Sequence, residues 1–83
     1  MSHPEVLNRT IHIFVEINRH EQKKVEFETD QVTGQQIKTQ ADVPLENDLA
    51  RRKGQKLELV TNDQTITIKN GEHFISLPPG TIS

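Results

Sequence analysis

Strict alternation of apolar and polar side chains marks the first half of the chain. Over residues 10–17 apolar side chains occupy every second position, the two-residue period of a strand with one buried face. Phe14 has the opposite parity, so it is expected to face outward. A polar turn at 18–22 leads to a second alternating run at 24–28. The two runs together predict a β-hairpin.

The next segment changes period and carries the signals of a helix start. Thr33 suits the N-cap position, and Gln36 three residues later completes a capping box. Ile37 supplies the inward side of the first turn. The helix is expected to end before Pro44, because the residue before a proline avoids helical angles. These signals predict a short helix over residues 34–41.

The remainder of the chain predicts short strands separated by turns. Residues 45–54 show no clear period, and the basic run 51–53 within them is interpreted as a solvated turn rather than a phosphate site. Asn70 and Gly71 form the strongest turn signal, since both tolerate positive φ. Three strands are predicted here, over 55–60, 64–68 and 74–77.

This order of elements predicts an α+β fold of the β-grasp type. A right-handed crossover through the helix would place the first and last strands side by side in the middle of the sheet. We therefore expect a mixed sheet of four to five strands with one helix packed across it. The predicted domain spans residues 10–77, preceded by a flexible arm (1–9) and followed by a flexible tail (78–83).

Composition restricts the function classes. A chain of 83 residues holds one small domain, and its net charge of −2 lacks the basic footprint of a nucleic-acid binder. No apolar run could span a membrane, and the N-terminus shows no signal peptide, so a cytoplasmic protein is expected. Without cysteine, and without an acid/base or nucleophile constellation, we expect no enzyme activity. The four histidines lack metal-site spacing, so we expect no metal site.

Three segments resemble one family over residues 11–80. The helix region at 33–38 with its exit at 41–44 is similar to that of ubiquitin folds. Residues 68–74 resemble the turn before the last strand of the bacterial ubiquitin-like proteins, which include the multi-ubiquitin domains of phage-defence and conjugation operons. The Pro78-Pro79-Gly80 tail resembles the segment before their processing point.

The resemblance implies a protein modifier without a catalytic residue or cofactor of its own. A processing peptidase would cleave before Thr81, and an activating enzyme would use ATP to adenylate the Gly80 carboxylate. A conjugating enzyme would then transfer the chain to a target protein. Pro78, Pro79 and Gly80 would enter the partner's narrow channel, where glycine avoids crowding the acyl carbonyl.

Other functions remain open. The Pro79-Gly80 pair is also typical of a simple turn, and the domain could be a non-covalent interaction module or, less favoured, a sulfur carrier. A partner surface is hypothesised at Phe14, Lys56 and Glu58. The last two are expected to lie on the outward face of the sheet, where their charge predicts poor binding to ordinary ubiquitin receptors. Six lysines are considered available as acceptor amines: Lys23, Lys24, Lys38, Lys53, Lys56 and Lys69.

Overall fold

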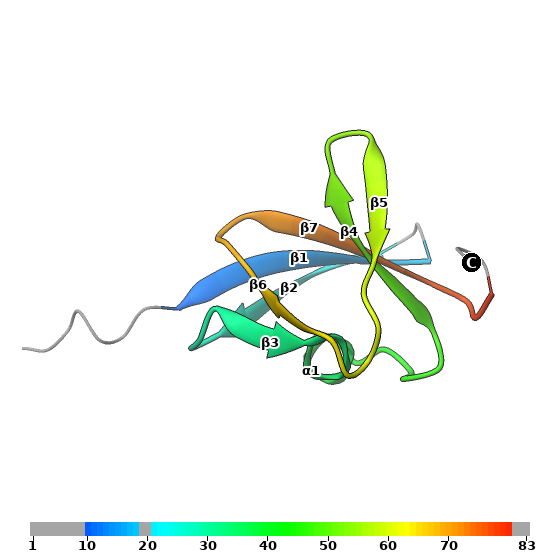
Figure 1. Ribbon diagram of the computed structural model, residues 1–83, viewed down its shortest axis with the longest axis horizontal. Helices are drawn as coiled ribbons and strands as arrows, with labels where there is room; N and C mark the ends of the chain where they lie inside the picture. The colour runs from blue at the N-terminus through cyan, green and yellow to red at the C-terminus, as the bar shows by residue number, and fades with distance from the viewer. Residues whose placement is uncertain (1–9, 19–20, 81–83) are drawn as a thin grey trace, which may run out of the picture.

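The computed structural model describes residues 10–18 and 21–80 (Figure 1). In chain order the elements are β1 (Ile11–Ile17), β2 (Glu21–Phe27), β3 (Gln31–Thr33), α1 (Gly34–Gln40), β4 (Asp48–Lys53), β5 (Lys56–Leu59), β6 (Thr65–Thr67) and β7 (Glu72–Leu77). The arm predicted at 1–9 and the last three residues of the predicted tail, 81–83, lie outside the described residues.

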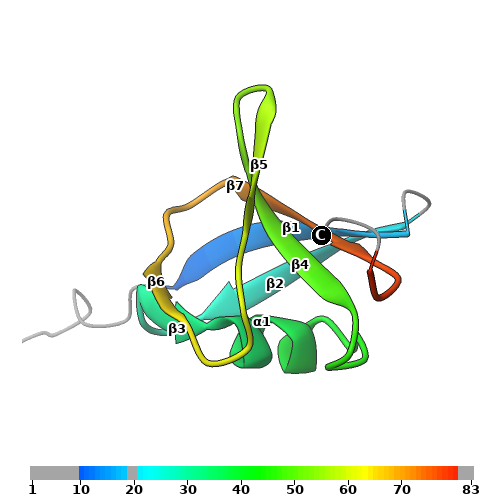
Figure 2. The same cartoon turned by 45° about the vertical axis from the view of Figure 1, so that its right-hand side comes forward.

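The main sheet has five strands in the order β2-β1-β7-β4-β5. Its two central strands, β1 and β7, are parallel, and the other neighbours are antiparallel. Helix α1 lies across one face, as Figure 2 shows, and none of the described residues forms a helix on the opposite face. This is the β-grasp arrangement predicted from the sequence, with the first and last strands paired in the middle.

The core lies between the sheet and α1. Alternation in β1 places Ile11, Ile13 and Val15 on the helix side, where they pack with Ile37 of the helix and Phe74 of β7. Each fully buried side chain of this size contributes about 1.5–3 kcal/mol relative to exposure. The core also includes Val25, Phe27, Val32, Ala41, Val43, Leu49, Val60 and Ile68.

Helix α1 starts with the predicted capping box. The Thr33 hydroxyl accepts a hydrogen bond from the Gln36 backbone N–H at 3.2 Å, and the Gln36 side chain accepts one from the Thr33 backbone N–H at 2.8 Å. The next residue, Gly34, packs directly on the loop that follows β5. A Cβ at position 34 would lie 2.3 Å from the carbonyl oxygen of Thr61 in that loop. The close approach of helix and loop therefore requires glycine.

The segment expected to be irregular forms a strand. β4 pairs with β7 on one side and β5 on the other, so the prediction for residues 45–54 was wrong over Asp48–Lys53. The predicted strand at 64–68 forms as β6, which joins β3 in a separate two-stranded sheet. The charged residues of β4 obscure the alternation that would predict a strand. The strand forms because β7 and β5 pair with its two edges.

Arg51 of β4 is a structural residue, contrary to its expected place in a solvated turn. Its guanidinium donates to the Thr67 carbonyl at 2.8 Å and lies 5.7 Å from the centre of the Phe74 ring. Its Nε is 3.4 Å from a carboxylate oxygen of Glu72. These contacts join β6 to the main sheet. Lys53 and Gly54, by contrast, are exposed at the hairpin tip.

Candidate functional site

The tail leaves the sheet from its central strand. β7 is buried from Phe74 to Leu77, and then Pro78, Pro79 and Gly80 are all exposed. Gly80 has φ 81°, and a Cβ built on it would meet nothing within 4 Å. The scaffold thus presents this glycine to solvent, while the cleavage predicted before Thr81 falls at the limit of the described residues.

Pro79 and Gly80 form a turn in this structure. The turn matches the simpler interpretation of the Pro-Gly pair, since a proline followed by a residue with positive φ is typical of a type II turn. Entry into a narrow channel would require this turn to open into an extended chain. Glycine permits both backbone conformations with little steric cost.

Part of the helix-free face of the sheet is apolar where β7, β4 and β5 lie side by side. Strand register places Ala50, Ile75 and Leu59 side by side on this face. Ala50, Ile75 and Leu77 form a small buried cluster, whereas Leu57 and Leu59 are 45% and 41% exposed. The face therefore has an apolar strip that continues from a buried cluster to exposed leucines.

The expected orientation of β5 is reversed. The sequence predicts Lys56 and Glu58 on the outward face of the sheet, but Glu58 pairs with Arg51, whose side chain lies over the helix-side Phe74. Lys56 has the same parity as Glu58. Both are exposed because β5 extends beyond the helix. Whether they contact a partner remains a prediction.

Phe14 faces away from the helix, as its parity predicts. Its ring stacks on His73 with centroids 5.2 Å apart and an interplanar angle of 22°. The two residues are direct neighbours across the parallel β1 and β7 pair. On the same face His12 Nδ1 lies 3.4 Å from Glu26. The β1 and β2 side of this face is consequently more polar than the side formed by β4 and β5.

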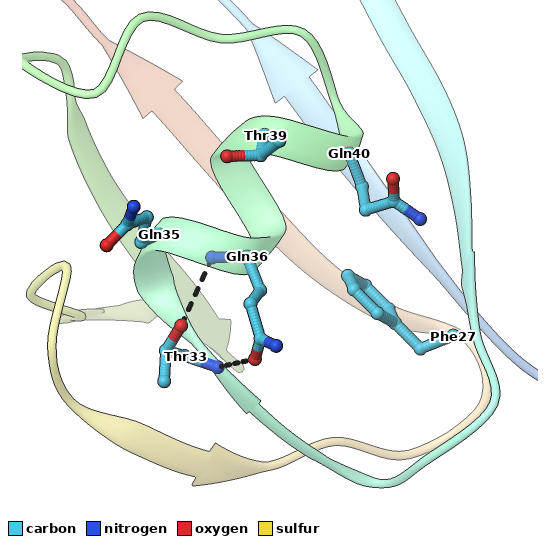
Figure 3. Close-up of a pocket in the computed structure, with 6 residues that line it drawn as sticks. All are labelled: Phe27, Thr33, Gln35, Gln36, Thr39 and Gln40. Carbon is cyan, nitrogen blue, oxygen red and sulfur yellow. Dashed lines mark hydrogen bonds between the residues drawn. The ribbon is translucent and has the colours of Figure 1, made fainter.

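A groove lies on the other side of the molecule, between β2 and α1. It has a volume of about 590 Å³ and is lined by Phe27, Thr33, Gln35, Gln36, Thr39 and Gln40 (Figure 3). Figure 3 shows Phe27 extending from β2 toward the helix and the capping bonds between Thr33 and Gln36. The polar groups of this lining are amides and hydroxyls, and none of them is a carboxylate, imidazole or amine. These lining residues therefore provide no general acid or base.

Lys38 was considered an available amine, but its side chain is buried. Its Nζ donates to the Leu45 carbonyl at 3.0 Å and to the Asn62 side-chain oxygen at 2.7 Å. Burial lowers the pKa of this ammonium, and the Asp48 carboxylate partly opposes that shift. Lys38 therefore connects the helix to two loops. A lysine among the uncharged polar residues of this helix gave no sequence signal of this role.

Among residues 10–18 and 21–80, no group of three or more His, Asp or Glu side chains could hold a metal ion. Within the same residues, no helix is long and apolar enough to cross a bilayer. No family model, curated protein or solved structure matches this chain.

Proposed function

We propose that this chain is a ubiquitin-like protein modifier, processed after Gly80 and conjugated through the Gly80 carboxylate. One observation carries the proposal: the buried central strand β7 is followed directly by three exposed residues, Pro78, Pro79 and Gly80. A rigid domain can dock on a partner enzyme while such a tail reaches the reaction centre. The chemistry then belongs to the partners, and this chain is their substrate.

The reaction proposed for Gly80 has four steps. A peptidase hydrolyses the bond before Thr81 and exposes the glycine carboxylate. An activating enzyme joins that carboxylate to AMP from ATP with release of pyrophosphate, and a cysteine thiolate displaces AMP to form a thioester. An amine or hydroxyl of the target displaces the thiolate. The cytoplasmic setting, bacterial origin and role in antiviral defence are part of this proposal and are supported by the resemblance in residues 68–80.

Intact and peptide masses test the proposal in the source cells. The wild-type chain is expected to lose residues 81–83 and to form heavier adducts. Lys69 is the last tryptic site before Gly80, so digestion would leave the peptide 70–80 attached to a target residue. Gly80→Glu should form no adduct.

Gly54→Glu is the matched control, because Gly54 also has positive φ and open space around its Cβ. This variant should form adducts like the wild type. Full-length, unmodified wild type in cells where the system is active would refute conjugation. So would adducts that persist in Gly80→Glu.

A non-covalent interaction module is the second candidate, favoured by the apolar strip on the helix-free face. The exposed Leu59 lies opposite the buried Ala50 there, which pairs with Ile75, and the exposed Leu57 lies opposite Arg52. This function predicts that deletion of residues 80–83 changes nothing, while Leu59→Glu abolishes partner binding. The modifier function predicts the opposite result for the deletion.

A further inference from the structure

β5 presents a strand edge to solvent. It is one of the two outermost strands of the main sheet, β2 being the other, and in the described part of the chain only β4 pairs with β5. Figure 1 shows the β4 and β5 hairpin standing clear of the rest of the domain. An exposed strand edge offers backbone N–H and C=O groups to another strand.

The hydrogen bonds of the hairpin show which residues supply those groups. The Val60 N–H donates to the Leu49 carbonyl at 2.8 Å, so the backbone groups of Val60 point toward β4. Backbone direction alternates along an antiparallel strand. Lys56 and Glu58 therefore bond toward β4, whereas Leu57 and Leu59 direct their backbone groups to the free edge.

The side chains of β5 are complementary to a second copy of themselves. Leu57 and Leu59 occupy one face at 45% and 41% exposure. Lys56 and Glu58 occupy the other face with opposite charges. Glu58 lies 3.8 Å from Lys53 in a pair that is more than half exposed, which leaves its carboxylate accessible to a further cation.

We propose that β5 is a homotypic docking edge at which two copies of this chain pair antiparallel, centred on Leu57. Leu57 and the partner's Leu57 then form a hydrogen-bonded pair through their outward backbone groups. Lys56 lies opposite the partner's Glu58 in a non-hydrogen-bonded pair, where side chains approach most closely. Two-fold symmetry repeats that ion pair.

Charge favours this register over the adjacent one, which is centred on Glu58. Pairing centred on Glu58 would also direct the leucine backbone groups to the partner, but it would place Glu58 opposite the partner's Glu58. Like charges directly opposite each other destabilise a strand pair. Because β5 is short, the dimer is weak and depends on concentration.

Charge reversal tests the register by sedimentation velocity over a roughly hundredfold concentration range. Lys56→Glu should weaken the wild-type dimer about tenfold, because it replaces two attractive pairs by two repulsive ones. The double variant Lys56→Glu/Glu58→Lys should restore the affinity. The hairpin itself keeps one opposite-charge pair in this double variant. In the wild type Glu58 lies opposite Arg51, whereas in the variant the new glutamate at position 56 lies opposite Lys53. Lys24→Glu on β2 is the charge-matched control and should not change association.

A disulfide provides a second test in this cysteine-free chain. The proposed register places Leu57 about 5.5 Å from the partner's Leu57 between Cα atoms, within the range of a disulfide. Leu57→Cys should form a covalent dimer in mild oxidant. Leu59→Cys is the control of similar exposure and should stay monomeric, because it lies opposite the partner's Gln55.

A wild-type monomer at every concentration overturns the proposal. Association that Lys56→Glu leaves unchanged, or that the double variant fails to restore, also overturns it, as does equal oxidation of the two cysteine variants. Amide spectra of each variant verify the fold. Deletion of residues 80–83 should leave the dimer intact, so the result is independent of conjugation at Gly80.

Discussion

Gly34→Ala tests whether the contact between α1 and the loop after β5 determines stability. The new Cβ would lie 2.3 Å from the Thr61 carbonyl oxygen and 2.9 Å from its carbon, which are both backbone atoms. Gly34 itself has no positive φ, so the effect is steric. The loop has little freedom to retreat, because Gln35 N–H donates to the Asn62 carbonyl at 2.9 Å and Val60 N–H donates to Leu49.

The expected cost follows from three contributions. Overpacking of a well-packed contact costs about 1–3 kcal/mol. Separation of helix and loop weakens the Gln35 to Asn62 bond and the 3.3 Å bond from Gly34 N–H to the Gln64 carbonyl, at about 1 kcal/mol each. The higher helix propensity of alanine offsets about 1 kcal/mol. The net loss in free energy of unfolding is about 2–4 kcal/mol, or roughly 8–30 °C in Tm.

Urea unfolding followed by far-UV circular dichroism measures this loss, since the chain has no Trp or Tyr for fluorescence. Gln35→Ala is the matched control: its side chain is exposed, and its backbone N–H bond to Asn62 is retained. The control should lie within about 0.5 kcal/mol of the wild type. If Gly34→Ala unfolded at the same midpoint as Gln35→Ala, the steric argument would be refuted.

Three other substitutions test individual contacts. Thr33→Ala removes the N-cap acceptor and should cost about 1 kcal/mol in urea unfolding, whereas no loss would contradict the capping role. Arg51→Met removes the hydrogen bond to Thr67 and the contact with Phe74. It should lower the free energy of unfolding by about 2 kcal/mol and increase amide exchange in β6. Unchanged exchange would contradict the role of Arg51 in joining β6 to the main sheet. For Lys38 the folded pKa is below the unfolded value of 10.5, so the unfolded state binds the proton more tightly. The stability of the wild type relative to Lys38→Met should therefore rise as pH increases from the folded pKa toward 10.5, and a flat difference in urea unfolding would contradict the lowered pKa.

Much of the fold could be predicted because its signals are local. Alternation in β1 and the capping box at Thr33 and Gln36 involve residues within a few positions of each other, so each can be recognised from its own segment. β4 could not be recognised in this way. Its Arg51 to Lys53 run has low apolar content, and the strand forms because β7 and β5 pair with its two edges.

The candidate tail site was proposed from the chain itself, since Pro78, Pro79 and Gly80 are adjacent in sequence. The face on which the side chains of β5 lie could not be predicted from the sequence in this way. Alternation in β5 predicts that Leu57 and Lys56 lie on opposite faces, but it does not say which face meets the helix. The pairing of Ala50 with both Leu59 and Ile75 decides that, and places the leucines on the helix-free side.

The sequence by itself determined the first hairpin, the helix start, the β-grasp class and the outward direction of Phe14, because periodicity and capping depend on neighbours along the chain. Tertiary structure alone decided the burial of Lys38, the need for glycine at position 34 and the orientation of β5. Each of these depends on a contact between residues distant in sequence. Such contacts exist only after the strands have taken their register around β7.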